Sequence, residues 1–255
     1  MTGKNAAMDY SKVAHLYDAY VKTDIDVPFF LKETKGCGTV LELMAGTGRV
    51  SLPLLEVGIN LTCVDNSRDM LTVLREKLKQ KGLSAIVHEM DVCELILPGQ
   101  YDLIILPFHS FSEIVDPEDQ RKALTEIRNH LMKTGRFICT LHNPPVRLKS
   151  VTGVKKVYGE YLLPDNTDKL VFSAMETYNA DKHIVTGTQF YEIFDHNGVI
   201  RSKSSVDIQF YLHSKEEFEV LVRSEGFTVI DLYGDYSYHH FDPDINPFMI
   251  WVLGQ

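Results

Sequence analysis

The fold is decided by residues 39–58, TVLELMAGTGRVSLPLLEVG. The first part is an apolar run interrupted only by Glu42, which is typical of a short buried strand. The run breaks at Ala45–Gly48, and apolar residues then recur with helical spacing until Gly58. Strand, glycine loop and helix in this order open a nucleotide-binding βα unit, because glycines let backbone approach a ligand and a helix N-terminus presents unpaired N–H groups.

This glycine loop differs from two common nucleotide-binding loops. A phosphate-binding P-loop has Lys and then Ser or Thr after its last glycine, whereas Gly48 is followed by Arg49 and Val50. A dinucleotide fingerprint spaces three glycines as G-x-G-x-x-G, and only Gly46 and Gly48 are present here. Neither of these two ligand types is therefore predicted by the loop.

An acidic residue ends the second predicted strand, Leu61–Asp65, 23 residues after Glu42. At that distance a strand-terminal carboxylate can accept both ribose hydroxyls of an adenosine. The alternative for Asp65 is a helix N-terminal acid, and Asn66 is expected to cap the following helix. We favour the ribose role because the acid is paired with the glycine loop.

Asp91 follows a third predicted strand, residues 84–88. It could accept the adenine amino group, but an acid after a strand is also common in any loop. Further strands are predicted at 101–108 and 136–141, separated by a helix with Asp116 as its N-cap and Pro117 in its first turn. Five strands alternating with helices predict an α/β fold with a doubly wound parallel sheet.

Residues 146–212 change in character. The segments 171–178, 189–194 and 206–212 are rich in β-formers, and His196-Asn197-Gly198 is a strong hairpin turn. This region is predicted to be an antiparallel β insert. The sheet pattern then returns with a helix that begins at a Ser214/Glu217 capping box and with two closing strands at 227–233 and 248–253.

Composition narrows the class of protein. The chain has 255 residues, 44% of them hydrophobic, and a net charge of −9, which argues against a partner with a phosphate backbone. Four cysteines without C-x-x-C spacing are expected to be reduced thiols. The sequence lacks an apolar leader and a membrane-length apolar run, so we expect a soluble, cytoplasmic protein without a membrane or nucleic-acid partner.

The ordered motifs resemble those of class I S-adenosylmethionine (SAM)-dependent methyltransferases over essentially the whole chain. ELMAGTG at 42–48 is similar to the family's first motif, E/D-x-G-x-G-x-G, and Asp65 and Asp91 take its later acidic places. The departure is Met44, which replaces the first glycine. We expect Met44 to hold an ordinary φ, so that the loop approaches its ligand differently there.

The resemblance implies a Rossmann-like seven-stranded doubly wound sheet with its last strand antiparallel. The core would comprise residues 1–145 and 213–255, with 1–36 as an N-terminal helical lid, and the antiparallel insert of 146–212 would serve as a substrate or dimer element. A helix is expected over residues 9–21, where aromatic residues recur at helical spacing. Those aromatics could lie over the cofactor or pack as ordinary core.

SAM is the implied cofactor and S-adenosylhomocysteine its product. The residues implied to bind it are Tyr10, Tyr17, Glu42, Met44, Ala45, Gly46, Thr47, Gly48, Asp65, Asn66, Met70, Asp91, Val92 and Leu106.

The acceptor is expected at the carboxyl ends of the strands, where ligands of open α/β sheets bind. His109, after the fourth strand, is the candidate general base, although a structural histidine is as reasonable. Candidate substrate residues are Tyr20, His142, Tyr236 and His239, for which a solvated loop position is the alternative.

Two other motifs are set aside. Asn143-Pro144-Pro145 resembles the N-P-P-Y motif of adenine N6-methyltransferases, but it follows the fifth strand and lacks the aromatic residue, so we expect a turn. His239-His240-x-Asp242 lacks a third cluster of ligands, so we expect no metal.

The predicted activity is transfer of the SAM methyl group to a nitrogen or oxygen of a small molecule by in-line displacement. A general base is needed only if the acceptor must lose a proton before attack. The alternatives are a protein or RNA methyltransferase and a SAM- or nucleotide-binding module without catalysis. A homodimer through the insert is possible.

Overall fold

The computed structural model describes residues 8–164 and 167–255, which form two β-sheets and the helices around them. The first seven residues of the predicted lid lie outside the described part. The strands are β1 Val40–Leu43, β2 Leu61–Asp65, β3 Ile86–Glu89, β4 Tyr101–Leu106, β5 Leu131–His142, β6 Lys156–Leu162, β7 Lys169–Asn179, β8 Ile184–Phe194, β9 Ile200–Tyr211, β10 Thr228–Tyr233 and β11 Phe248–Gly254. The α-helices are α1 Ala14–Tyr20, α2 Val27–Glu33, α3 Ser51–Glu56, α4 Arg68–Lys81, α5 Pro117–His130, α6 Pro144–Arg147 and α7 Lys215–Ser224. The short 3₁₀ helices are η1 Tyr10–Lys12, η2 Val92–Glu94, η3 Ser110–Glu113 and η4 Leu148–Ser150.

The larger sheet has seven strands in the order β10-β11-β5-β4-β1-β2-β3. Strands β1 to β5 are parallel, and β11 runs antiparallel to both of its neighbours. The strand order reverses between β1 and β4, which is where ligands of doubly wound sheets bind. The predicted Rossmann-like sheet with an antiparallel last strand is confirmed.

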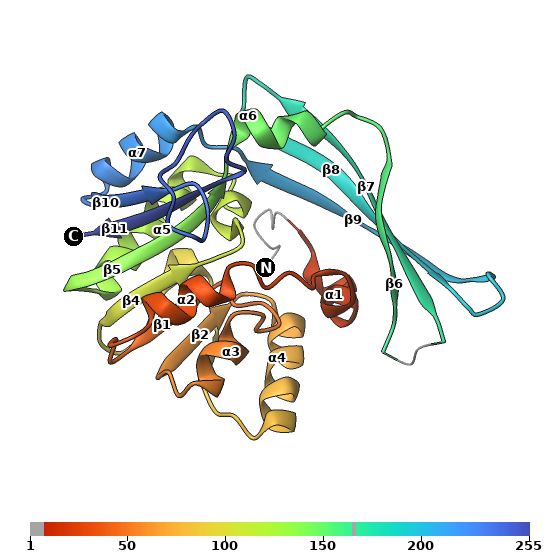
Figure 1. Ribbon diagram of the computed structural model, residues 1–255, viewed down its shortest axis with the longest axis horizontal. Helices are drawn as coiled ribbons and strands as arrows, with labels where there is room; N and C mark the ends of the chain where they lie inside the picture. The colour runs from red at the N-terminus through yellow and green to blue at the C-terminus, as the bar shows by residue number, and fades with distance from the viewer. Residues whose placement is uncertain (1–7, 165–166) are drawn as a thin grey trace.

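Helices cover both faces of this sheet (Figure 1). On one face Leu124 of α5 and Phe218 of α7 belong to the same buried cluster as the sheet residue Trp251. On the other face the apolar residues of α2, α3 and α4 belong to the same buried cluster as Leu103 and Ile105 of β4. Because β4 is covered on both faces, it reads in the sequence as a continuous apolar run.

The second sheet is the predicted antiparallel insert, with the strand order β6-β7-β8-β9. Figure 1 shows this sheet extending from the core and curving around α1. The buried face of α1 and the residue before it, including Val13 and Leu16, form a cluster with Leu170, Tyr191 and Val206 of the insert. The apolar face of α1 therefore packs on the insert.

Local structure differs from expectation at several points. The predicted helix over 9–21 is broken at Val13, whose ψ of 0° separates η1 from α1. The cap of α4 is Ser67, whose hydroxyl accepts from the Met70 N–H at 3.4 Å, and Asn66 does not cap it. The third strand begins at Ile86, two residues later than predicted. Asp116 caps α5 as expected.

The insert is larger than its sequence pattern suggested. Strand β6 was not predicted, because its side chains are mostly exposed and its pattern is weak. The Asn143-Pro144-Pro145 segment is not a simple turn: Asn143 precedes the short helix α6, and its side-chain amide donates to the carbonyls of Pro243 and Asn246 at 2.8 and 2.7 Å.

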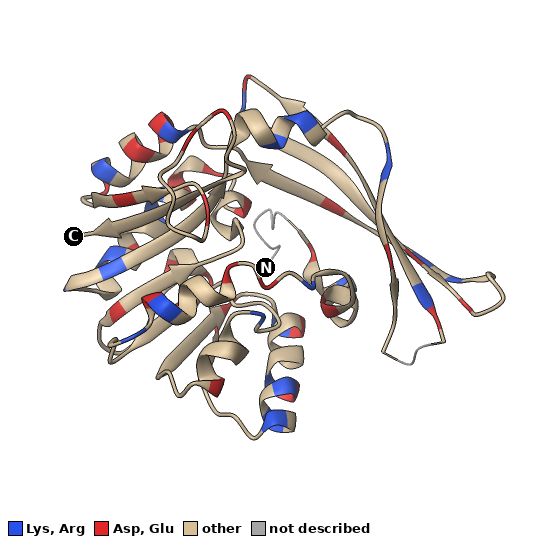
Figure 2. Ribbon diagram, viewed as in Figure 1, with Lys and Arg blue, Asp and Glu red and all other residues tan. Residues whose placement is uncertain are grey.

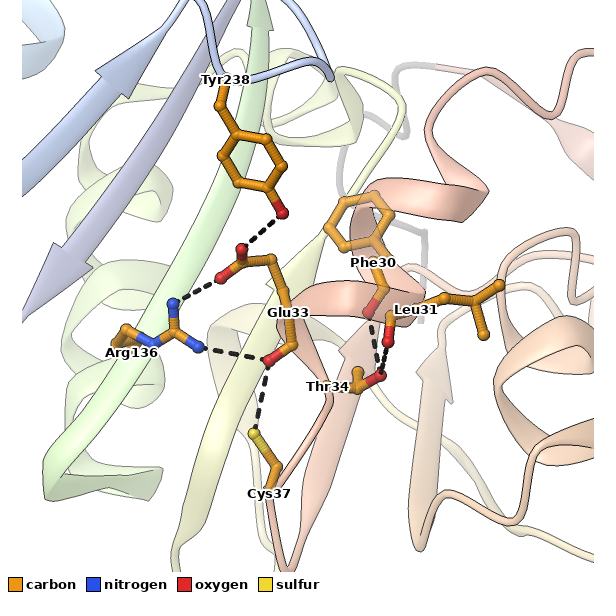
Figure 3. Close-up of polar contacts among 7 residues, drawn as sticks. All are labelled: Phe30, Leu31, Glu33, Thr34, Cys37, Arg136 and Tyr238. Atoms are coloured by element: carbon orange, nitrogen blue, oxygen red, sulfur yellow. Dashed lines mark hydrogen bonds and ion pairs between the residues drawn. The ribbon is translucent and has the colours of Figure 1, made fainter.

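A cluster of hydrogen bonds and an ion pair around Glu33 connects α2 to the rest of the core (Figure 3). The Glu33 carboxylate pairs with Arg136 of β5 and accepts from the Tyr238 hydroxyl at 2.8 Å. The contacts join the N-terminal helices, a central strand and the loop between β10 and β11. Within residues 8–164 and 167–255, no helix combines the length and apolarity that crossing a bilayer requires.

Candidate functional site

A cavity of about 1220 Å³ lies where the carboxyl ends of the parallel strands, the N-terminal segment and the insert meet. The core contributes residues after β1, β2, β4 and β5, the N-terminal segment contributes tyrosines, and the insert contributes strand residues that face the core. Among the residues that line the cavity are Tyr10, Tyr17, Tyr20, Met44, Gly46, Asp65, Asn66, Met70, Asp91, Val92, Phe108, His109, Glu113, His142, Arg147, Glu176, Gln189, Gln209 and Phe210.

The glycine loop takes an unusual conformation at its first position. Met44 has a φ of +53°, in the left-handed region, so the expectation of an ordinary φ there is wrong. Gly46 and Gly48 also have positive φ, at +56° and +86°. The loop therefore keeps a conformation that suits glycine, although a methionine occupies its first position.

Contacts with the rest of the core hold this loop in place. The Gly46 N–H donates to Oδ2 of Asp65 at 2.7 Å, so the acid of β2 is tied to the loop. A Cβ on Gly48 would come within 2.3 Å of Cδ1 of Leu74, which explains why this position is a glycine. Gly48 thus allows α4 to pack directly against the loop.

Two acids predicted for the cofactor lie on the cavity wall. Asp65 also accepts from the Ser67 N–H at 2.8 Å, and burial raises the pKa of its carboxyl. Asp91 accepts from the Cys93 N–H at 2.9 Å. Each carboxylate oxygen can accept more than one hydrogen bond, so both side chains retain acceptor capacity toward the cavity.

Three tyrosines of the N-terminal segment enclose the cavity. The rings of Tyr10 and Tyr17 meet edge to face at 6.2 Å, and those of Tyr17 and Tyr20 at 5.6 Å. The same segment reaches the glycine loop through Asp18, which accepts from the Thr47 hydroxyl at 2.6 Å and pairs with Lys77 of α4 at 2.7 Å. These contacts position α1 over the loop.

His109 and His142 stand together at the ends of β4 and β5. Burial lowers the pKa of His109 to about 3, while a hydrogen bond with the backbone of Leu141 acts in the opposite direction. Burial also lowers the pKa of His142, and the neighbouring His109 adds to the effect. Within the described residues, the buried Nδ1 of His109 has no hydrogen-bond partner. The pair therefore presents two neutral imidazoles at this end of the cavity.

Three polar residues of the cavity were missed in the sequence. Arg147 of α6 pairs with Glu176 of β7 at 2.6 Å and lies over the ring of Phe210 at 5.1 Å. Glu113, the last residue of η3, accepts from the Tyr10 hydroxyl at 2.8 Å. Glu113 lies after the carboxyl end of β4, as His109 does, so the sequence could have indicated it. Glu176 comes close to Arg147 only when the insert folds.

Several predicted residues lie outside the cavity lining. Glu42, within β1, is buried beneath the loop, where its Oε2 accepts from the Ser51 hydroxyl at 2.6 Å and burial raises its pKa to about 8. Leu106 is fully buried in β4. Ala45 and Thr47 are buried in the loop, and Gly48 packs beneath Leu74.

Two predicted substrate residues are also elsewhere. Tyr236 packs on Phe29 and Phe248, with ring centroids 5.7 Å away in both cases. His239 is exposed and pairs with Asp235 at 2.8 Å. Over the part of the chain that the structure describes, no group of three His, Cys, Asp or Glu side chains is arranged to hold a metal ion.

Carboxylates dominate the charged lining of the cavity. The acidic residues are Asp65, Asp91, Glu94, Glu113, Asp116, Glu118, Asp119 and Glu176, whereas the lysine and arginine residues are Lys122 and Arg147. By contrast, basic and acidic residues occur together on α4 and α7, as Figure 2 shows. The cavity therefore favours cationic ligands.

Comparisons with known proteins agree on one activity. A family profile described as a methyltransferase domain matches residues 40–135. A glycine/sarcosine N-methyltransferase of Halorhodospira halochloris is 25% identical over 240 residues, which cover 89% of this chain and 80% of the relative. A SAM-dependent methyltransferase from Clostridium acetobutylicum superposes with a TM-score of 0.78 at 20% identity, covering 96% of this chain and 98% of that one. An amino pentose methyltransferase from Micromonospora echinaspora, solved with SAM bound, superposes with a TM-score of 0.70 at 16% identity and covers 99% of each chain.

Proposed function

The chain is a class I SAM-dependent methyltransferase that acts on small molecules, and from that premise we propose that its acceptor atom is the nitrogen of an amine. When bound, SAM supplies a methyl group that its positively charged sulfur has already activated. The contribution left to the protein is to bind both ligands, align them and exclude water.

The residues around the glycine loop fit SAM. We propose that Asp65 accepts hydrogen bonds from the ribose hydroxyls and that Asp91 accepts one from the adenine amino group. Asn66, Met70 and Val92 would lie beside them. Support comes from the acceptor capacity that both carboxylates retain and from their positions on one cavity wall. Tyr10, Tyr17, Met44 and Gly46 line the same cavity and complete the proposed cofactor site.

The observation that carries the amine proposal is the excess of carboxylates around the cavity. An acidic, partly buried cavity attracts a sulfonium and an ammonium alike, because its potential favours positive charge. The same lining gives no support to an RNA acceptor, whose phosphates would be repelled.

The histidine pair does not supply the base that an oxygen acceptor needs. An alcohol must lose its proton as it attacks, whereas an amine attacks with a free lone pair once it is neutral. With a pKa of about 3, His109 is too weak a base to deprotonate an alcohol. We therefore propose that His109 contacts the acceptor as a neutral imidazole and that His142 fixes the ring of His109 by stacking.

The far wall of the cavity suits a polar acceptor. Arg147 and Glu176 present a paired cation and anion, and Gln189 and Gln209 add amide groups. Tyr20 lies between the cofactor end and the insert, and we propose that it contacts the acceptor. The curated relative is named for N-methylation of glycine and sarcosine, which is consistent with a small polar amine.

Two broader properties stay proposals. A homodimer through the insert is supported by the exposed apolar side chains of Val157, Leu162 and Met175, which a second copy would cover. Light scattering of the purified protein would distinguish one chain from two. We also propose a cytoplasmic location, supported by four cysteines that form no disulfide with one another.

The test begins with calorimetric titration of SAM, S-adenosylhomocysteine and NAD. We expect both sulfur nucleotides to bind and NAD not to. Asp65→Ala should weaken SAM binding at least about 10-fold, because a hydrogen bond to a charged group contributes about 1.5–3 kcal/mol. Asp69→Ala, at an exposed acid on the first turn of α4, is the matched control and should leave affinity unchanged.

The acceptor atom is tested with methyl-labelled SAM and paired compounds. Glycine, sarcosine and an amino sugar are compared with glycolate and the parent sugar. Label is expected only in amines. Label in the alcohols, or in no compound despite tight SAM binding, would contradict the amine proposal.

A further inference from the structure

We propose that Glu113 is a catalytic residue that binds the acceptor as an ammonium ion and removes its proton before methyl transfer, and that Tyr10 positions its carboxylate. This inference rests on the proposed function, because it requires an amine acceptor. It assigns a role to a residue that the glycine loop and the acidic motifs do not include.

The position of Glu113 places its carboxylate on the cavity. Glu113 ends η3, four residues after His109, and lines the same cavity as Asp65 and His142. Its Oε1 accepts from the Tyr10 hydroxyl at 2.8 Å. Among residues 8–164 and 167–255, no side chain or backbone N–H donates to Oε2. One oxygen is therefore held by the N-terminal segment while the other remains available to a ligand.

The surroundings of Glu113 suit a cation. The groups that face it are Tyr10 of η1, Tyr17 and Tyr20 of α1, and Asp65 at the end of β2. Burial raises the pKa of all three tyrosines, so they remain protonated and act only as donors or as ring faces. Tyrosine rings attract an ammonium group through their negative faces, and the carboxylate supplies the opposite charge.

The acidity of Glu113 matches this role. Burial raises the pKa of its carboxyl to about 7, the hydrogen bond from Tyr10 lowers it, and the negative charge of Asp65 raises it. A base with a pKa near the working pH exchanges protons efficiently with an ammonium ion. The other nearby candidates have other roles or are too weak: Asp65 is proposed to bind the ribose hydroxyls, Glu176 pairs with Arg147, and His109 has a pKa of about 3.

The proposed step balances without another reactant. One ammonium proton moves to Oε2 of Glu113, which leaves a lone pair on nitrogen. That lone pair forms the new N–C bond as the C–S bond breaks, and the electron pair of the broken bond stays on sulfur. The product leaves as a methylated ammonium ion, and the proton on Glu113 passes to solvent.

The kinetic test compares Glu113→Gln with Glu76→Gln, an exposed acid of α4, using an amine identified in the labelled screen. The profile of kcat/KM for the amine against pH should rise through a pKa near 7 in the wild type. Glu113→Gln should remove this rise and lower kcat/KM about 100-fold, a typical contribution of acid–base catalysis. SAM affinity by calorimetry should change less than about threefold, and Glu76→Gln should behave as the wild type.

Tyr10→Phe provides a second, independent measurement. Because the Tyr10 hydroxyl stabilises the ionised carboxylate, its removal should raise the pKa of Glu113 and move the rise in kcat/KM to higher pH. This shift remains measurable even if Glu113→Gln fails to fold. A purely structural role for the tyrosine would lower activity without moving the profile.

The outcomes separate the two proposals. If the wild type methylates no amine, the proposed function fails, and this inference fails with it. If the wild type methylates amines and Glu113→Gln keeps both rate and profile, only the role of Glu113 is overturned. A fall in SAM affinity that accounts for the whole loss of rate would instead assign Glu113 to the cofactor.

Discussion

The imidazole rings of His109 and His142 stack with their centroids 3.7 Å apart, although 32 residues separate them in the chain. The contact exists because β4 and β5 are neighbouring parallel strands whose carboxyl ends meet at one edge. Two imidazoles this close and this buried disfavour protonation of either ring. The stack therefore makes this end of the cavity a neutral surface within an acidic lining.

This arrangement predicts a loss of stability in mild acid. The folded-state pKa of His142 lies well below its ordinary value, so below about pH 6.5 the unfolded chain binds a proton that the folded chain does not. The contribution of His142 to the free energy of unfolding should therefore decrease as pH falls from about 6.5, whereas the raised pKa values of Glu42 and Glu113 act in the opposite direction. His142→Phe keeps an aromatic face against His109 and should reduce this decrease. Thermal unfolding at pH 7.5 and 5.5 measures it, with the exposed His15→Phe as control. An equal decrease in wild type and His142→Phe would contradict the argument.

The positive φ of Met44 predicts that stability responds differently to two substitutions. The left-handed conformation disfavours non-glycine residues by about 1–2 kcal/mol, and β-branched residues most. Met44→Gly removes that strain but also an apolar side chain packed on the core, so stability should change by less than about 1 kcal/mol. Met44→Val should destabilise the protein by about 1–2 kcal/mol more than Met44→Gly. Urea denaturation measures both, and equal effects would show that the loop relaxes away from this φ.

Gly48 is predicted to be far less tolerant than another glycine of similar φ. Gly48→Ala combines a φ of +86° with a Cβ 2.3 Å from Leu74, whereas Gly58 has a φ of +83° and open space around its Cβ position. Gly58→Ala should cost about 1 kcal/mol. Gly48→Ala should cost at least about 2 kcal/mol, because overpacking adds to the strain, and should weaken SAM binding.

The same comparison in a Leu74→Ala background checks the cause. Removing the Leu74 side chain takes away the atoms that the new Cβ would meet. The extra destabilisation by Gly48→Ala should then shrink toward that of Gly58→Ala. If it does not, the close approach of α4 is not the reason for a glycine at this position.

The core could be predicted from the sequence because its periodicity is strong and local. Local patterns alone predict several elements. The apolar runs predict β1, β2 and β4, and the capping residues Asp116 and Ser214 predict where α5 and α7 begin. Two features with weaker patterns could not be predicted. Strand β6 is largely exposed. Whether Asn66 or Ser67 caps α4 depends on the turn in which Asp65 accepts from the Ser67 N–H. Methionine at a positive φ could not be predicted, because surrounding contacts override the residue's own preference.

The candidate site was only partly accessible to sequence reasoning. Residues that directly follow parallel strands, such as Asp65 and His109, reach the cavity as topology predicts. Tyr236 and His239 also lie near strand ends, yet the contacts of their loop turn them into the core and toward solvent. Arg147 and Glu176 meet only because the insert folds back over the core, a juxtaposition that no spacing in the sequence encodes.

The packing of α1 has a consequence for turnover. One side of this helix is buried against the insert, and Asp18 on another side is bonded to the glycine loop and α4. If SAM and the acceptor bind as proposed, a displacement of α1 would uncover both ends of the cavity together. Exchange of the methyl donor and exchange of the acceptor would then depend on the same helix.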